Sequence, residues 1–222
     1  MIEIAIDGPA ASGKGSLGKK LSDKYNIPYL DTGILYRKVA YELIKNNIKN
    51  SENLEILCCN FAKNLNLKEF KNKNLRTEDV AKLASKIAIF PNLRKILNNK
   101  QKEFSNFNKK QFGGCILDGR DIGTTILPNA DFKFFITASI EVRAKRRLLQ
   151  KNISFLHEND EKCMLHTLIN DMKERDKLDS NRKTSPLVPA KDAHVIDTTI
   201  INSQELLLIV INIIEGKNEL LK

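Results

Sequence analysis

A glycine-rich segment near the N-terminus has the residues and spacing of a loop that binds phosphate groups. It reads GPAASGKGS over residues 8–16 and separates an apolar run, Ile2–Ile6, from a helical pattern, Lys14–Tyr25. Glycines allow consecutive backbone N–H groups to point at phosphate oxygens, and the start of the following helix adds a favourable dipole. We expect Lys14 to reach the β- and γ-phosphates of a nucleotide and the Ser16 hydroxyl to meet phosphate or Mg²⁺. The predicted ATP-binding loop consists of Gly8, Pro9, Ala10, Ala11, Ser12, Gly13, Lys14, Gly15 and Ser16.

Two further motifs follow predicted strands, where an α/β sheet presents its ligands. DTGILYR covers residues 31–37 and opens a helix, and DGRDIGT covers residues 118–124 after the apolar run Cys115–Leu117. A DTG turn alone is also found in aspartic proteases. Here it opens a helix in an α/β chain with a phosphate-binding loop, which favours a ligand-binding turn. The sequence therefore predicts a second part of the ligand site at these strand ends.

The order and detail of these motifs resemble a known family. Gly15 follows the loop lysine, and the hydroxyl comes one residue later, a form similar to the loop of nucleoside monophosphate kinases. Together GPAASGKGS, DTGILYR, DGRDIGT and the late ERDKLDSNR…PLVPA run resemble bacterial cytidylate (CMP) kinases, from Ile2 to about Thr199. Adenylate kinases and eukaryotic UMP/CMP kinases resemble the chain at the glycine-rich loop, but usually carry a DGFPR-like sequence at the later strand end.

The resemblance implies transfer of the γ-phosphoryl group of ATP to CMP or dCMP, with Mg²⁺ as cofactor. Cytosine offers a 4-amino donor, for which a carboxylate is a natural acceptor. The residues matching the family's CMP-binding positions are Thr32, Arg94 and Asp121 for the base, Arg37, Arg120 and Arg182 for the monophosphate, and Ser85, Arg175 and Asp179 for the pentose. Catalytic roles are implied for Lys14, Arg120 and Arg182, an ATP contact for Arg147, and a metal contact for Ser16.

Simpler interpretations of some of these residues stay open at this point. Asp118 and Asp121 could hydrogen-bond to the backbone of their own loop, and Ser85 could be a helix-face hydroxyl. Arg143, Arg146 and Arg147 could form a solvated helix face.

The expected reaction needs no general base. The second pKa of a phosphate monoester is about 6, so the acceptor is mostly a dianion at neutral pH. Catalysis would therefore consist of positioning and of neutralising charge on the transferring group, by Lys14, Mg²⁺ and arginines.

The net charge of +10 admits other partners. With 37 Lys+Arg against 27 Asp+Glu, the chain could attract nucleic acid, an anionic membrane or small polyphosphates. Low aromatic content, 6% with no Trp, argues against a P-loop nucleic-acid-binding ATPase. A kinase for another nucleoside monophosphate, UMP or dTMP, is the nearer alternative. We expect small nucleotides (ATP, CMP, dCMP) as partners, with no nucleic acid and no membrane.

Short apolar strands alternating with helices predict an α/β protein with a parallel sheet covered on both faces. With the resemblance, this becomes a three-layer P-loop fold with a five-stranded parallel sheet, an inserted acceptor-binding lobe and a short lid. The whole chain, 1–222, would be one kinase domain. Its parts would be a core of 1–37, 113–150 and 186–222, a monophosphate-binding lobe of about 38–112, and a lid of about 151–185. The family often carries a larger insert with its own small sheet, which residues 48–75 would shorten.

Cysteine use and hydropathy indicate the environment. Cys58, Cys59, Cys115 and Cys163 lack the spacing of zinc ligands, and we expect all four to be reduced packing residues. The N-terminus lacks a signal-peptide pattern, and no apolar run reaches 18 residues. We therefore expect a cytoplasmic, monomeric protein.

Overall fold

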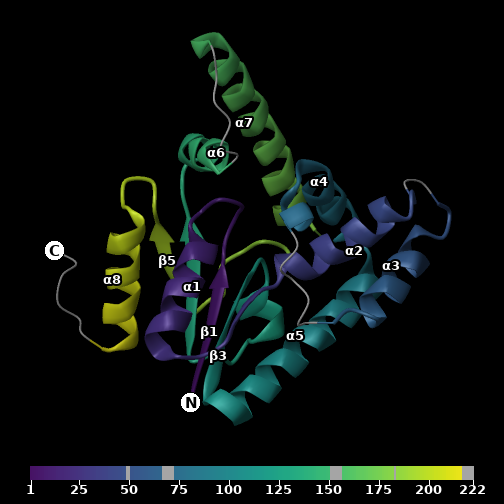
Figure 1. Ribbon diagram of the computed structural model, residues 1–222. Helices are drawn as coiled ribbons and strands as arrows, with labels where there is room; N and C mark the ends of the chain where they lie inside the picture. The colour runs from purple at the N-terminus through teal and green to yellow at the C-terminus, as the bar shows by residue number, and fades with distance from the viewer. Residues whose placement is uncertain (49–50, 67–72, 151–156, 183, 217–222) are drawn as a thin grey trace.

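A parallel five-stranded sheet forms the centre of the computed structural model, which describes residues 1–48, 51–66, 73–150, 157–182 and 184–216. Its order is β2-β3-β1-β4-β5, and all four neighbouring pairs are parallel (Figure 1). The strands are β1 (Ile2–Asp7), β2 (Tyr29–Asp31), β3 (Gly114–Gly119), β4 (Phe132–Thr137) and β5 (His194–Asp197). The predicted α/β class and the five-stranded parallel sheet are confirmed.

Helices connect the strands, as parallel pairing requires. They are α1 (Lys14–Tyr25), α2 (Gly33–Lys45), α3 (Leu54–Lys63), α4 (Glu78–Ile87), α5 (Pro91–Phe112), α6 (Ile140–Leu149), α7 (Glu158–Ser180) and α8 (Ser203–Ile214). Two short turns, η1 (Lys73–Arg76) and η2 (Ile122–Ile126), complete the described elements. The sequence predicted α5 only to about Phe107, but it continues until Gly113, whose φ of 74° ends the helix in the left-handed region.

Alternate residues of the strands face two different layers. Ile4, Ile6 and Phe134 pack in one apolar cluster with residues of α1 and α8. Ala5 and Leu117 pack in a second cluster with Ile122 and Ile126 of η2 and with Phe104 of α5. This alternation of successive side chains produces the three-layer arrangement.

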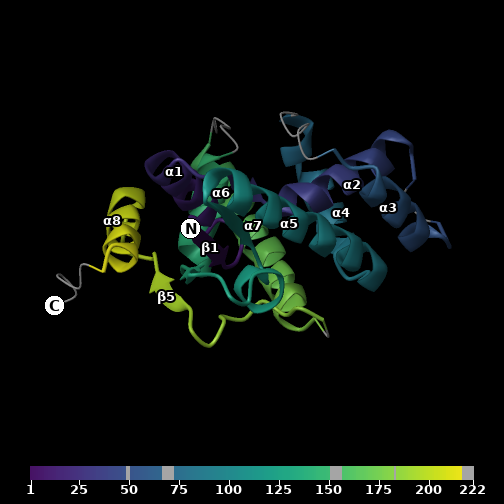
Figure 2. The same cartoon turned by 90° about the horizontal axis from the view of Figure 1, so that it is seen from below.

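A separate helical core lies beside the sheet. α2, α3, α4 and α5 gather on the side away from α8 (Figure 2), and they share a cluster of buried residues that includes Leu35, Leu43, Cys58, Ile87 and Leu97. Of the shortened insert 48–75, the structure describes α3 and η1, while residues 49–50 and 67–72 lie outside the described residues.

The four cysteines are free thiols, but they do not share one environment. Cys58 and Cys115 are buried and Cys59 is half-buried, whereas Cys163 is exposed on α7. The expectation that all four pack inside the protein was therefore wrong for Cys163. Among the described residues no helix is long and apolar enough to cross a bilayer.

Asp7, the last residue of β1, joins the sheet to η2. Its Oδ1 accepts a hydrogen bond from the backbone N–H of Ile122 at 2.8 Å, and its Oδ2 accepts one from Gly123 at 2.7 Å. The residue is only 4% exposed. Burial raises the pKa of Asp7 to about 6, although the two hydrogen bonds favour the ionised form. The carboxylate thereby holds the backbone just after Arg120 and Asp121 against the start of the glycine-rich loop.

Replacing Asp7 tests this attachment. Asp7→Ala leaves two buried N–H groups unpaired, so we expect the free energy of unfolding to fall by about 2–4 kcal/mol. Asp7→Asn keeps one acceptor but turns an amide donor toward the second N–H, and we expect a smaller loss. Urea unfolding of the three proteins measures the order. Equal stability of Asp7→Ala and the unmodified protein would contradict the proposed attachment.

Candidate active site

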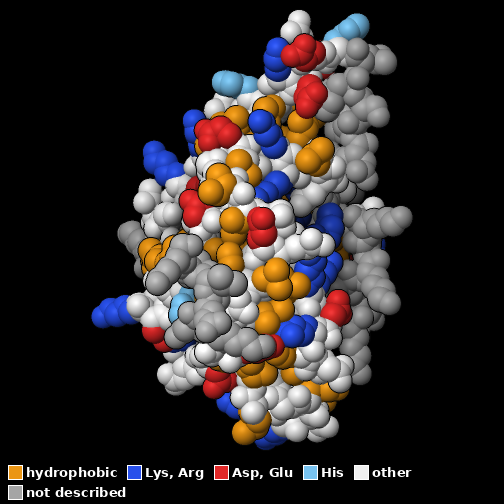
Figure 3. All heavy atoms as spheres, turned by 90° about the vertical axis from the view of Figure 1, so that its left-hand side faces the viewer, with side chains coloured by type: hydrophobic (Ala, Val, Ile, Leu, Met, Phe, Trp, Pro, Cys, Tyr) orange, Lys and Arg blue, Asp and Glu red, His pale blue; other side chains and the backbone are white. Residues whose placement is uncertain are grey.

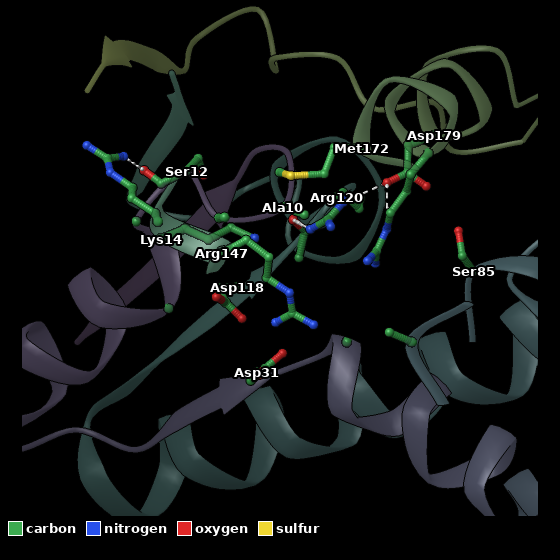
Figure 4. Close-up of a pocket in the computed structure, with 18 of the residues that line it drawn as sticks. Ala10, Ser12, Lys14, Asp31, Ser85, Asp118, Arg120, Arg147, Met172 and Asp179 are labelled. Atoms are coloured by element: carbon green, nitrogen blue, oxygen red, sulfur yellow. Dashed lines mark hydrogen bonds and ion pairs between the residues drawn. The ribbon is translucent and has the colours of Figure 1, made fainter. Parts of the chain in front are cut away.

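One cavity of about 1120 Å³ lies at the carboxyl ends of the strands (Figure 4). Its walls come from the glycine-rich loop, the starts of α2 and η2, α4, α5, α6, α7 and the segment before α8. The predicted site residues that line it are Ala10, Ala11, Ser12, Gly13, Lys14, Gly15, Ser16, Thr32, Arg37, Ser85, Arg94, Arg120, Asp121, Arg147, Arg175, Asp179 and Arg182. Residues spread over most of the chain therefore meet in one space.

Gly8 and Pro9 belong to the predicted loop but do not line the cavity. Gly8 has a φ of 148°, and a Cβ there would lie 2.0 Å from the carbonyl oxygen of Ile136 in β4. Only glycine allows the backbone to pass so close to the sheet. Pro9 accepts a hydrogen bond through its carbonyl oxygen from Lys14 Nζ at 3.2 Å. In the structure, Gly8 therefore sets the path of the loop next to β4, and the Pro9 carbonyl oxygen binds the side chain of Lys14.

Lys14 lies at the centre of a charged cluster in the cavity. Burial lowers the pKa of Lys14, and the nearby Arg120 guanidinium lowers it further, while Asp118 and Asp31 oppose the shift. Burial, together with the charge of Asp31, raises the pKa of Asp118. A polyphosphate entering this cavity would favour the charged form of the lysine.

The carboxylates of Asp118 and Asp31 face each other beside Arg147 (Figure 4). The Tyr29 hydroxyl lowers the pKa of Asp118, whose Oδ1 is buried without a hydrogen-bond partner among the described residues. Carboxylate and hydroxyl oxygens, with phosphates and waters, are ligands that Mg²⁺ prefers. No group of three or more His, Cys, Asp or Glu side chains in the described part of the chain could hold a metal by itself. Asp118, Asp31 and Ser16 therefore fit a Mg²⁺ ion bound chiefly through a nucleotide.

Two of the predicted base-reading residues, Arg94 and Asp121, form a buried ion pair, and the third, Thr32, contributes a hydroxyl. Arg94 Nη2 lies 2.6 Å from Asp121 Oδ2, and the two side chains are 6% and 10% exposed. A second nitrogen, Arg94 Nη1, donates to the carbonyl oxygen of Ala88 at 3.2 Å. Thr32 donates its hydroxyl to the carbonyl oxygen of Asp118 at 2.8 Å. These contacts show that Asp121 bonds to a side chain across the cavity wall rather than only to its own loop.

Asp179 brings three arginines together. Its Oδ2 accepts from Arg120 Nε at 2.9 Å, and its Oδ1 accepts from Arg182 Nη2. Arg175 Nε lies 4.0 Å from Oδ2. Burial alone would raise the pKa of Asp179, but the charges of these arginines outweigh burial and lower it. The predicted pentose contact of Asp179 stays a prediction, and its observed partners are arginines.

Ser85 lies at the same end of the cavity as Asp179, on the right of Figure 4. Its Oγ is buried without a hydrogen-bond partner among the described residues, although the residue belongs to the amphipathic helix α4. A helix-face hydroxyl could return its hydrogen bond to the preceding turn. Here no such bond is found among the described residues.

The three arginines of α6 point to different partners. Arg143 Nη1 donates to the carbonyl oxygen of Ala10 at 3.4 Å, and its Nη2 pairs with Asp176 of α7 at 2.6 Å. Arg146 Nη1 donates to the carbonyl oxygen of Ser12 at 3.4 Å. Arg147 instead extends into the cavity above the two aspartates (Figure 4). The interpretation of all three as a solvated face was therefore wrong, because two of them hold the glycine-rich loop.

Several cavity residues carried no sequence motif. Arg76, which had no assigned role, lies 3.5 Å from Asp31 Oδ2. The segment before α8 contributes Thr198, Ile200 and Asn202. Its only sequence signal was Asn202 three residues before Glu205, which forms a capping box at the start of α8. Nothing in that signal indicates a ligand.

Comparison with known proteins places the chain in a family. A family model for cytidylate kinase matches residues 4–216. A cytidylate kinase from Bartonella tribocorum is 42% identical over 196 residues, which cover 88% of this chain and 86% of that protein. The chain belongs to the cytidylate kinase family. Another member, from Methylocella silvestris, is 40% identical over 219 residues, covering 99% of this chain and 96% of that protein.

The comparison of structures bears on the fold alone. An uncharacterized protein from Eubacterium ventriosum has a TM-score of 0.51 to this member of the cytidylate kinase family at 17% identity. The match covers 97% of this chain and 99% of that one. The α/β architecture is thus shared well beyond close relatives.

The Arg94–Asp121 pair of this cytidylate kinase family member can be tested by a double-mutant cycle. Asp121→Ala leaves a guanidinium buried without its carboxylate, so we expect a loss of about 3–5 kcal/mol in the free energy of unfolding. The double variant, Asp121→Ala with Arg94→Ala, should lose much less free energy of unfolding than the sum of the losses in the two single variants. Urea unfolding of the four proteins measures the coupling, and additive losses would show that the two side chains do not interact.

Proposed function

We propose that the chain transfers the γ-phosphoryl group of ATP to CMP or dCMP. One observation carries this proposal: of nine buried polar side-chain atoms without hydrogen-bond partners in the described part of the chain, six belong to residues that line the cavity. Buried polar atoms are normally hydrogen-bonded, so such a concentration indicates a polar ligand. The atoms are Ser12 Oγ, Ser85 Oγ, Gln101 Oε1, Asp118 Oδ1, Arg175 Nε and Arg182 Nε.

ATP would occupy the end of the cavity formed by the glycine-rich loop. The backbone of residues 10–16 would surround its phosphates, with Lys14 and Arg147 supplying positive charge. Its base would lie between the end of α6 and the segment before α8, where Leu149 and Ile200 are 77% and 94% exposed. Covering these apolar side chains with a flat base would remove them from water.

CMP would occupy the end between α2, α4, α5 and α7. Arg37, Arg120 and Arg182 would hold its phosphate, and Arg94, Asp121 and Thr32 would meet its base. Burial lowers the pKa of both Arg37 and Arg182, with neighbouring arginines adding to the shift. A phosphate dianion would relieve this repulsion between confined cations. The pentose would lie near Ser85, Arg175 and Asp179.

The reaction would be an in-line displacement between the two nucleotides. An oxygen of the CMP phosphate would attack the γ-phosphorus of ATP, the bond to the β–γ bridging oxygen would break, and ADP would leave. Lys14, Arg120 and Arg182 would neutralise the charge on the transferring group and fix the two phosphates in line. Bound Mg²⁺ would supply further neutralisation of the phosphates. The chain needs no general base, because the acceptor is already a dianion.

Closure over the substrates would prevent loss of ATP to water. We propose the lobe, about 38–112, and the lid, about 151–185, as the moving parts, although 49–50, 67–72, 151–156 and 183 lie outside the described residues. α4 and α7 face each other across the cavity and are joined by an ion pair of 3.0 Å between Lys82 and Asp171. A contact between these two helices fits a closed arrangement.

A nucleic-acid-binding ATPase and a nucleotide kinase require different distributions of positive charge on the protein. A nucleic-acid-binding ATPase would need a continuous basic track. On the face that carries α8, Lys and Arg are interspersed with acidic and apolar side chains (Figure 3). Lys14, Arg37, Arg120, Arg147, Arg175 and Arg182 instead line a cavity of nucleotide size. We therefore propose small nucleotides as partners of a monomeric, cytoplasmic enzyme.

A panel of acceptors tests the proposal. With ATP and Mg²⁺, we expect kcat/KM for CMP and dCMP to exceed that for UMP and dTMP by about 10-fold or more, because the buried carboxylate of Asp121 matches an amino group. Coupled measurement of ADP release gives the values. ATP turnover no faster with CMP than with water alone, or turnover stimulated by RNA or DNA, would contradict the proposed reaction.

The arginines of α6 provide a second test. Arg147→Ala removes a charge proposed to meet the phosphates, so we expect the KM for ATP to rise about 10-fold or more with an unchanged melting temperature. Arg146→Ala removes bonds to Ser12 and Thr198 and should lower the melting temperature. Lys145→Ala, an exposed charge on the same helix, is the matched control. An unchanged KM for ATP in Arg147→Ala would exclude a phosphate contact by Arg147.

A further inference from the structure

Gln101 on α5 is a buried polar residue that the mechanism above does not use. It is 2% exposed and lines the cavity. Its Oε1 is buried without a hydrogen-bond partner among the described residues. An amide oxygen in this condition destabilises the folded protein, because it has lost its hydrogen bonds to water without replacing them.

Three other buried polar side chains of α5 have hydrogen-bond partners. Arg94 bonds to Ala88 and Asp121, Ser105 donates to Glu3, and Asn108 donates to the carbonyl oxygen of Phe104. Two side chains of the same helix differ, because Gln101 Oε1 and Asn98 Oδ1 are buried without a partner among the described residues, and of these two residues Gln101 lines the cavity. Helix packing therefore does not explain a polar residue at this position, and an apolar side chain would suit the free protein better.

The position of Gln101 assigns it to one end of the cavity. It follows Arg94 by seven residues, which is about two turns, so the two side chains share one face of α5. Arg94 pairs with Asp121, the residue proposed to meet the cytosine amino group. Gln101 therefore extends the polar wall of the base end rather than that of the glycine-rich loop.

We propose that Gln101 is a specificity-determining residue that hydrogen-bonds to the acceptor base; this rests on the proposed function. The amide carries one acceptor and two donors. Asp121 already gives its Oδ2 to Arg94, so a 4-amino group with two hydrogens can be shared between the remaining carboxylate oxygen and Gln101 Oε1. A uracil offers a carbonyl oxygen at the same place. The Gln101 amide can rotate by half a turn and donate a hydrogen bond from Nε2 to this oxygen. Gln101 thus determines how well UMP is accepted relative to CMP.

Three variants separate this role from a structural one. Gln101→Leu keeps the bulk but removes the amide, and we expect the KM for CMP to rise about 10-fold or more, with the KM for ATP unchanged and the melting temperature unchanged or higher. Gln101→Glu keeps an acceptor but no donor, so we expect the ratio of kcat/KM for CMP over UMP to rise about 10-fold. Gln111→Leu makes the same change at an exposed position of α5 and serves as the control.

Each other result has a definite meaning. An unchanged KM for CMP in Gln101→Leu, or a fall in melting temperature with both KM values rising together, would overturn the role in base binding. Failure of Gln101→Leu to fold would also overturn the role in base binding, because the amide would then be required for folding. An unchanged CMP/UMP ratio in Gln101→Glu would overturn the role in choosing the base. Failure of the proposed function is a separate result: the unmodified protein would not phosphorylate CMP.

Discussion

Confinement of like charges is the physical constraint on which the site depends. Lys14, Arg120, Arg175 and Arg182 line one cavity, and most of their positive charge is removed from water. Asp179, with a side chain only 2% exposed, offsets this repulsion by accepting hydrogen bonds from two arginines and lying 4.0 Å from a third. Burial, with a contribution from the Arg120 charge, still lowers the pKa of Arg175 to about 10. The free protein therefore holds an incompletely balanced set of cations, whose charge an anionic ligand would balance.

The scaffold holds these charges in place through the backbone of the glycine-rich loop. Thr198, after β5, donates to the carbonyl oxygens of Ser12 and Thr137, each at 3.0 Å. Arg146 donates to Thr198 and to the carbonyl oxygen of Ser12. With its carbonyl oxygens bonded outward in this way, the loop keeps its N–H groups for phosphate. Arg143 extends the same network to α7, so the loop and that helix share one support.

Much of the scaffold was predictable because it depends on local patterns. The bounds of α1 and α8 match the apolar periodicity, and the strands coincide with short apolar runs, all of which except β4 end at a carboxylate or a glycine. Parallel pairing then brings the residues after β1, β2 and β3 to one edge. η2 was not predicted, because its five residues carry no periodic signal and are held by Asp7, 115 positions earlier. A contact of that range has no local pattern.

The sequence by itself determined the family, the fold class and many of the residues around the cavity, because short motifs and apolar spacing act over a few positions. Tertiary structure alone decided what each arginine does. Arg143, Arg146 and Arg147 lie within five residues on one helix, yet two bond to backbone carbonyls and one enters the cavity. It also decided that Gln101 lacks a partner while Ser105, one turn later, has one. A side chain's role depends on which distant atoms surround it, and that follows only from how the layers pack.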